Sequence, residues 1–187
     1  ADSLVRGRHP RQQMAGLKSQ LELLKRMATS HEGIGSAAQS VLAEAGHGAL
    51  EGVEAREALA DSIKIEAGAE KAIGLLLGDR VEALLIEDAK AARKILTFLK
   101  SSQGGRLMMA PSVFPRVRWK GPAREESALK LVSAEGAAGR MLEVLLGHAY
   151  VTADLEAAKK LKGELPHAVI ATKAGQLITA EGIIISG

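Results

Sequence analysis

The chain has 187 residues, no cysteine and a formal net charge of +3, with an isoelectric point near 9.2. The lack of cysteine excludes disulfides and thiolate metal sites and fits a reducing compartment, and no apolar run reaches the roughly 20 residues that span a bilayer. Only 2% of the residues are aromatic although 47% are hydrophobic, so small and branched aliphatic side chains must fill the core. The weak basic excess permits contact with nucleic acid without requiring it.

The first 28 residues predict a tail followed by the end of a long helix. The chain starts at Ala1 without a Met, and its polar, basic opening closes at Pro10, so we expect a piece of a longer protein. Apolar residues then recur at spacings of three and four: Met14, Leu17, Leu21, Leu24 and Met27. So narrow a stripe suits the seam of a coiled coil, and an ordinary amphipathic helix packed on its own domain is the alternative.

Strands and helices alternate in the middle of the sequence. The predicted elements are a strand at 62–65, a helix at 69–78, a buried strand at 81–86, a helix at 89–99 and a strand at 106–110. Gly78 is placed to end the first helix and Asp88 to cap the second, while Pro111 is expected to stop the last strand. The expected inner face of the second helix consists of Ala92, Ile95, Leu96 and Leu99.

The stretch 112–122 carries prolines, half of the aromatic residues and a local basic excess. This composition predicts an irregular connection between two lobes. The elements predicted after it are helices at 123–131 and 137–146, a strand at 149–153, a helix at 155–162, a strand at 168–172 and a strand from 177 onward.

Two segments of the chain resemble one another. LLGDRVEALLIEDAKAARKIL begins at Leu76 and LLGHAYVTADLEAAKKL begins at Leu145. In each, Leu-Leu-Gly ends a helix, a strand follows, and an aspartate (Asp88 or Asp154) caps a helix with an Ala-Ala pair. Chance sharing of caps and alanines is the alternative. The order of the matched features favours a mixed α/β (α+β) fold of two small pseudo-repeated lobes, in which helices flank β-sheets.

Sequence motifs for a reaction are missing. There is no GxxxxGK[ST] loop for nucleotide phosphates, no GxSxG elbow and no HExxH zinc motif, and the five histidines are widely separated. We therefore predict no catalytic residue, no metal site and no cofactor, so that the chain is not an enzyme by itself. A soluble α/β ligand-binding or enzyme domain is the alternative, and it would need a deep pocket with convergent polar groups.

Two groups of basic residues are candidates for nucleic-acid contact. The first group surrounds Trp119 and consists of Arg116, Arg118, Lys120 and Arg124. The second lies near the proposed coil and includes Lys18, Lys25 and Arg26. Cations beside a stacking ring can hold single-stranded nucleic acid without reading its sequence. The alternatives are a solvated surface with Trp119 in a lobe junction and, at the other extreme, a chain whose primary role is nucleic-acid binding.

Taken together, these segments resemble the hinge domain of the structural-maintenance-of-chromosomes (SMC) proteins. The segments that carry the likeness are HEGIGSAAQSVL, DSIKIEAGAEKAIGLLLGDRVEALLIEDAKAARKILTFLK, GGRLMMAP, VTADLEAAKKL and AVIATKAGQLITAEGIIISG. The resemblance implies a tail and arm at 1–28 and a hinge at 29–187, with lobes at about 29–111 and 123–187 joined by 112–122. It also implies a bacterial type of homodimer that joins two arms of a cytoplasmic, nucleoid-associated protein for chromosome condensation and segregation, whose ATPase heads lie elsewhere.

The resemblance further implies an interface between two copies of the chain. Its expected residues are Gly105, Arg106, Gly182, Ile183, Ile184, Ile185 and Gly187. Glycine allows close backbone approach at a strand edge, and consecutive isoleucines favour a strand that a partner could cover. The alternative for GIIISG is a last core strand of one lobe. The other implied partners are the returning coiled-coil arm of the same chain and DNA, with no membrane.

Overall fold

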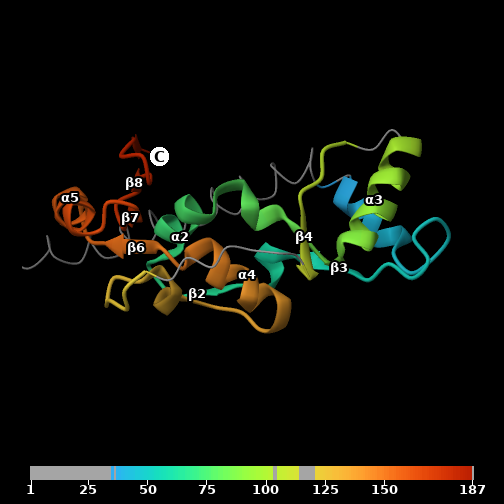
Figure 1. Ribbon diagram of the computed structural model, residues 1–187, viewed down its shortest axis with the longest axis horizontal. Coiled ribbons are helices and arrows are strands. Elements are labelled where there is room, and N and C mark those ends of the chain that lie inside the picture. Colours follow the sequence, from blue (N-terminus) through green and yellow to red (C-terminus); the bar gives the residue numbers. More distant parts are fainter. Residues whose placement is uncertain (1–34, 36, 103–104, 114–120, 187) are drawn as a thin grey trace, which may run out of the picture.

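The computed structural model describes residues 35, 37–102, 105–113 and 121–186. They form an elongated molecule with a β-sheet toward each end of its long axis, and helices α2 (Glu70–Leu77) and α4 (Gly136–Leu146) lie between the sheets (Figure 1). The predicted tail and arm at 1–28 lie outside the described residues, as does most of the predicted connection at 112–122.

The first sheet has the strand order β1–β3–β4, formed by Ala55–Ala58, Leu84–Asp88 and Met109–Val113. β3 and β4 are parallel, and α3 (Ala89–Ser101) makes the crossover between them. Aliphatic side chains of α3, of β3 and of a helical segment at 37–44 pack into one core. A parallel pair requires such a crossover because the chain must return to the same end of the sheet before the second strand begins.

The second sheet has the strand order β6–β7–β8–β9, formed by Ala149–Thr152, Val169–Thr172, Gln176–Ile178 and Ile184–Ser186. β6 and β7 are parallel and joined by α5 (Leu155–Glu164), whereas β8 and β9 continue the sheet as antiparallel strands. Ile170 and Ile178 pack with residues of α5, and Ala171 packs with residues of α2. Helices therefore cover both faces of this sheet.

The region between the sheets belongs to both halves of the sequence. α2 packs against β7 and β8, although its sequence lies in the predicted first lobe, and α4 contacts both β4 and β6. β2 (Lys64–Ile65) pairs with β5 (Val132–Ser133) and makes a further connection. Ile63, Ala134 and Leu145 each pack against two of the hydrophobic clusters. The sheets thus share one aliphatic interior, and the lobe boundaries near 111 and 123 stay predictions.

The two resembling segments fold into the same unit of helix, strand, helix and strand. α2, β3, α3 and β4 of the first unit correspond to α4, β6, α5 and β7 of the second. Asp88 Oδ1 accepts hydrogen bonds of 2.8 Å from the backbone N–H groups of Lys90 and Ala91, and Asp154 accepts one of 2.8 Å at the start of α5. The first unit is longer because the 3₁₀ helix η2 (Gly78–Glu82) separates its helix from its strand. The predicted pseudo-repeat is confirmed.

The strand predicted before Pro111 and the helix predicted after Pro122 both differ from the structure. The strand expected at 106–110 begins only at Met109 and continues through Pro111 to Val113. β4 lies at the edge of its sheet, where a residue without an N–H is tolerated. The helix expected at 123–131 is absent, and only the short 3₁₀ helix η3 (Ala128–Leu131) forms there, because its apolar residues turn into the shared interior just before β5.

Two predicted strands begin late because a 3₁₀ helix precedes each of them. η1 (Leu59–Ser62) precedes β2, and η2 precedes β3. The strands predicted at 62–65 and 81–86 therefore begin at Lys64 and Leu84.

The predicted inner face of α3 needs one correction. Leu96 is 48% exposed, and Ala91 is buried instead together with Ile95 and Leu99. These three residues follow a spacing of four and lie on one stripe, whereas Leu96 lies about 100° away from Ile95 around the helix. Ala92 is only half-buried beside this stripe.

Candidate dimerisation edges

The chain's last described strand is presented by a tight hairpin turn between β8 and β9. Thr179 N donates to Ile183 O at 2.9 Å, Gly182 N to Thr179 O at 3.0 Å, and Ile183 N to Thr179 Oγ1 at 3.2 Å. Gly182 has a φ of +88°, and a Cβ built on it would meet nothing within 4 Å. The pattern is that of a three-residue hairpin loop closed by a glycine bulge. Within one chain, the turn conformation and not close packing therefore requires Gly182.

β9 is the outermost strand of its sheet in the described part of the chain. Ile183, Ile184 and Ile185 are 59%, 52% and 45% exposed. Alternate residues of an antiparallel strand turn their N–H and C=O groups toward the same neighbour. Because Thr179 and Ile183 form a hydrogen-bonded pair, Leu177 and Ile185 form the next one, and Ile184 directs its backbone groups to the open side. β9 thus offers both apolar side chains and unpaired backbone groups to a partner.

A second edge lies in the first sheet, where β4 is an outer strand in the described part of the chain. Val113 ends this strand and is 73% exposed. Gly105 and Arg106, which precede β4, are exposed as well. The predicted interface residues therefore fall on two edges of one molecule, one edge in each sheet, except for Gly187, which lies outside the described residues.

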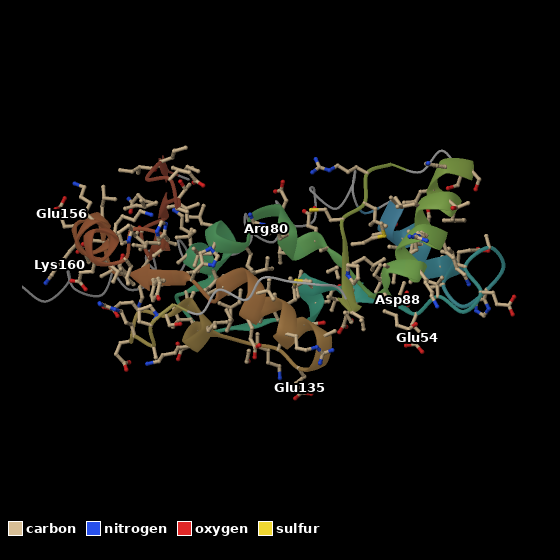
Figure 2. All side chains as sticks on the ribbon, viewed as in Figure 1. Glu54, Arg80, Asp88, Glu135, Glu156 and Lys160 are labelled. Carbon is tan, nitrogen blue, oxygen red and sulfur yellow. The ribbon has the colours of Figure 1, made fainter. Side chains whose placement is uncertain are left out.

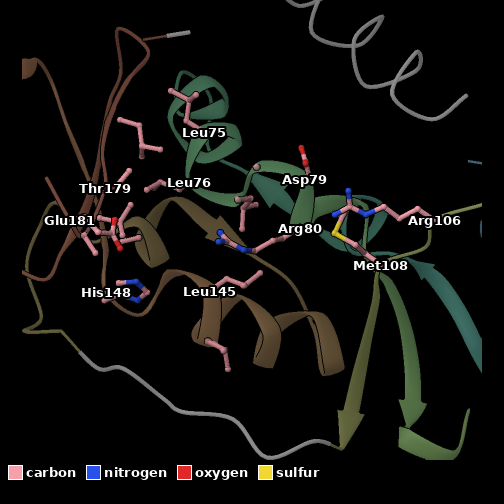
Figure 3. A pocket seen from close by; sticks show the side chains of 17 residues that line it. Leu75, Leu76, Asp79, Arg80, Arg106, Met108, Leu145, His148, Thr179 and Glu181 are labelled. Carbon is pink, nitrogen blue, oxygen red and sulfur yellow. The ribbon is translucent and has the colours of Figure 1, made fainter. Parts of the chain in front are cut away.

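A cavity of about 800 Å³ opens between these two edge regions. Arg106 and Met108 lie on one side of it and Thr179 and Glu181 on the other, with the side chain of Arg80 reaching between them (Figure 3). Its charged groups are of both signs. Within the described ranges, no three histidine, aspartate or glutamate side chains are gathered as ligands for a metal ion.

His148 lines the same cavity, just after the end of α4. Burial of its imidazole lowers the pKa of His148, and the positive charge of Arg80 lowers it further. Figure 3 shows the Arg80 guanidinium directed toward His148 and Glu181. Both effects favour the neutral form of the imidazole.

Arg124 is the only predicted DNA-contact residue in the described part of the chain. It forms an ion pair of 2.8 Å with Glu164 of α5. With Lys160 and Lys173 it lines a hollow beside the carboxyl ends of β6 and β7, and Lys160 points away from α5 into solvent (Figure 2). Three carboxylates, those of Glu125, Glu126 and Glu164, also line the hollow, so its surface carries both signs of charge. The described ranges do not include the other predicted DNA-contact residues or the tryptophan beside them, which are Lys18, Lys25, Arg26, Arg116, Arg118, Trp119 and Lys120.

Sequence reasoning missed Lys160 and Lys173 as companions of Arg124. The three residues lie far apart in the sequence, and the parallel order of β6 and β7 brings them together. The available signal was the predicted pair of strands at 149–153 and 168–172, because side chains that follow parallel strands meet at one edge of a sheet.

The fold of the chain matches those of solved SMC hinge domains. The crystal structure of an asymmetric dimer of the Geobacillus stearothermophilus hinge matches with a TM-score of 0.72 and 24% identity, over 95% of this chain and 75% of that one. The Pyrococcus furiosus Smc hinge with an extended coiled coil matches with a TM-score of 0.70 and 23% identity, over 93% and 63% of the two chains. At such identities the likeness establishes the fold.

A family model described as "SMC proteins Flexible Hinge Domain" matches residues 54–162, more than half of the chain. The chain belongs to this family of SMC hinge domains. The model describes a hinge and not a catalytic domain. None of the helices in the described residues is long and apolar enough to cross a membrane.

Curated relatives carry the name chromosome partition protein Smc. The protein of Chlorobaculum tepidum is 28% identical over 136 residues, which make up 69% of this chain and 11% of that protein. The protein of Mycolicibacterium paratuberculosis is 30% identical over 65% of this chain and 10% of its own length. The match to the Myxococcus xanthus protein, 23% identical, covers 95% of this chain and 15% of that protein. The chain therefore spans between 10% and 15% of the length of these relatives.

Proposed function

We propose that the chain is the homodimerisation hinge of a bacterial chromosome partition protein, and that its two edge strands make the contacts. The observation that carries the proposal is β9, an open strand edge with three half-exposed isoleucines. An uncovered strand of this composition would promote aggregation, so a partner strand is its expected neighbour. The solved Geobacillus stearothermophilus hinge is a dimer, which is consistent with this use of the fold.

The presence of two different edges on one chain allows a closed pair. A second copy related by a two-fold axis can place its segment 105–113 against β9 of the first copy, and the same contact then repeats with the roles exchanged. Each sheet gains a strand from the partner through backbone hydrogen bonds. Burial of Ile184 and Val113 at each contact removes apolar surface from water. The product is a ring-like homodimer with two equivalent contacts.

Ile184→Pro tests this contact with little disturbance of the single chain. Proline removes the N–H of residue 184, which points to the open side, and leaves the hydrogen bonds between β8 and β9 in place. Light scattering should give a mass near twice 19.6 kDa for the unaltered chain and near 19.6 kDa for the variant. Ile184→Val keeps both the N–H and a branched side chain, so this control should remain a dimer.

Two results would contradict the proposal at different levels. If the unaltered chain is a monomer at every concentration of a dilution series, the proposed homodimerisation is wrong. If the Ile184→Pro chain keeps the dimer mass, β9 is not part of the dimer interface. A bulky residue at Gly182 is a poorer test, because any side chain is strained at its positive φ whether or not a partner is present.

In the longer protein, the proposed dimer joins two coiled-coil arms. Residues 1–28 would hold the end of one arm, the hinge proper would extend over 29–187, and the returning arm would pack beside the first. The Pyrococcus furiosus hinge was solved with an extended coiled coil, which supports this arrangement by analogy. The ATPase heads would lie beyond this chain, and the assembled protein would act in the cytoplasm at the nucleoid, in keeping with relatives named for chromosome partition.

Weak DNA contact that does not depend on sequence is a separable part of the proposal. It rests on the gathering of Arg124, Lys160 and Lys173 around one hollow of the second unit. Charge reversal at Lys160 and Lys173 together should weaken the binding of labelled single-stranded DNA at low salt and leave the dimer mass unchanged. Unchanged binding would assign these cations to the solvated surface.

A further inference from the structure

Lys162 in the last turn of α5 binds three backbone carbonyl oxygens. Its Nζ donates hydrogen bonds to Ala168 O at 2.7 Å, Thr179 O at 2.8 Å and Ala180 O at 3.0 Å. An ammonium group has three N–H donors, so these contacts occupy all of them. The side chain is half-buried, where a charge is stable only if its donors are satisfied.

The three carbonyls belong to two separate parts of the second unit. Ala168 directly precedes β7, whereas Thr179 and Ala180 begin the turn between β8 and β9. Thr179 is also the residue through which the turn closes, since its N–H, carbonyl and hydroxyl each bond to Gly182 or Ile183. Lys162 therefore fastens the turn to the layer formed by α5 and β7.

β9 has few other attachments in the described part of the chain. Its three residues are exposed, and β8 is the strand with which it pairs. A hairpin of such short strands is marginally stable by itself. The direction in which β9 presents its open edge thus depends on how the turn is held.

The electrostatics around Lys162 agree with a fixed cation at the turn. Burial lowers the pKa of Lys162, and the negative charge of Glu181 opposes that change. Hydrogen bonds from Thr179 and from its own backbone lower the pKa of Glu181 and so favour its carboxylate form. The ammonium and the carboxylate therefore stabilise the same turn from two positions.

We propose that Lys162 is the positioning residue for the interface strand β9: its ammonium group holds the β8–β9 turn so that the open edge at Ile184 faces the second copy. The interface part of this inference rests on the proposed dimerisation. Lys159 supplies a matched control on the same helix, because its Nζ pairs only with the exposed Glu156 at 2.8 Å among the contacts described.

The lack of cysteine in the chain permits a test by chemical rescue. Lys162→Cys removes the ammonium and introduces a single thiol. Alkylation of this thiol with 2-bromoethylamine restores an amine on a thioether of nearly the length of lysine, whereas iodoacetamide adds a neutral amide. Sedimentation equilibrium should show a dimer dissociation constant raised at least about tenfold in the variant and returned to within about threefold after aminoethylation, but not after carbamidomethylation.

Hydrogen exchange at residues 179–185 measures the turn directly in either assembly state. Exchange should quicken in Lys162→Cys and slow again only after aminoethylation, while Lys159→Cys treated in the same way should change neither exchange nor dimer affinity. If Lys162→Cys does not fold, Lys162→Arg keeps the charge, but its planar guanidinium cannot converge on three carbonyls, so faster exchange is expected there too.

The outcomes separate this inference from the proposed function. Unchanged exchange and affinity in Lys162→Cys, or equal recovery with both reagents, would overturn the positioning role. A monomeric unaltered chain whose exchange still responds to the ammonium would support Lys162 as the anchor of the turn and overturn dimerisation at β9.

Discussion

The two α/β units share one plan and differ in what lies beside their second parallel strand. In the second unit, β7 is covered by β8 and the hairpin continues to β9, whereas the corresponding strand β4 of the first unit is an edge. The elements that both units share form the hydrophobic core. The β8–β9 hairpin, which follows only the second unit among the described residues, makes the outer strands of the two sheets differ. In the proposed dimer, the partner's β9 takes beside β4 the place that β8 takes beside β7. In the described part of the chain no strand lies beyond β4, and this is where the proposed second copy would add one.

The largest expected effect tests whether the two units fold as one body. Ile86 of β3 and Ile170 of β7 are both fully buried, so Ile86→Ala and Ile170→Ala should each lower the free energy of unfolding by about 2–5 kcal/mol. Because α2 and α4 connect the sheets, urea unfolding followed by circular dichroism should keep one transition in both variants. Two transitions, with only one of them shifted, would show that the units are independent.

A smaller effect compares the two aspartate caps. Asp88 accepts hydrogen bonds from two backbone N–H groups and Asp154 from one in the described contacts. Asp88→Ala should therefore cost about 1–2 kcal/mol and Asp154→Ala about 0.5–1 kcal/mol in thermal unfolding. Asn at either position can still accept these bonds and should recover most of the loss. Equal costs would mean that the second bond at Asp88 adds nothing to the stability of the first unit.

The smallest effect concerns the residue that follows Leu-Leu-Gly, which is Asp79 in the first unit and His148 in the second. Burial and the charge of Arg80 lower the pKa of His148 below its usual 6.5, so between the lowered pKa and 6.5 the unfolded chain binds a proton that the native chain does not. Stability should therefore fall as the pH falls through this window.

Thermal unfolding at about pH 7.5 and at about pH 5.5 measures this difference. The melting temperature should fall slightly on acidification, and His148→Gln should remove that part of the slope. If the melting temperature of the variant depends on pH as steeply as that of the unaltered chain, other groups cause the dependence. His148 would then differ from Asp79 in no way that affects stability between these pH values.

Local signals predicted much of the fold. Gly78 ends α2, Asp88 and Asp154 cap α3 and α5, and the helix at 137–146 is α4 within one residue. These features depend on hydrogen bonds and apolar spacing within about one or two helical turns, so a short window of sequence contains them. The strand through Pro111 could not be predicted in this way, because it depends on β4 being an edge.

The candidate site was predicted less completely than the fold. The isoleucines of β9 are visible in the sequence as a strand, but their exposure depends on the order of four strands. Gly182 was expected to allow close approach of a partner, and this stays a prediction; its role in the turn, through its positive φ, is visible only in the structure. No sequence signal marked Lys162 as an anchor. It binds backbone carbonyl groups of the residues before β7 and after β8, and every residue has such a group.

By itself the sequence determined the repeated α/β units, their caps and the resemblance to SMC hinges, because periodicity, caps and the order of motifs are properties of neighbouring residues. Only the tertiary structure decided that α2 packs on the sheet of the other half, that β4 and β9 are outer strands among the described residues, and that Lys162 fastens the turn before β9. These features arise where segments distant along the chain meet, and burial of a shared interior selects that meeting among the many that the local pattern allows.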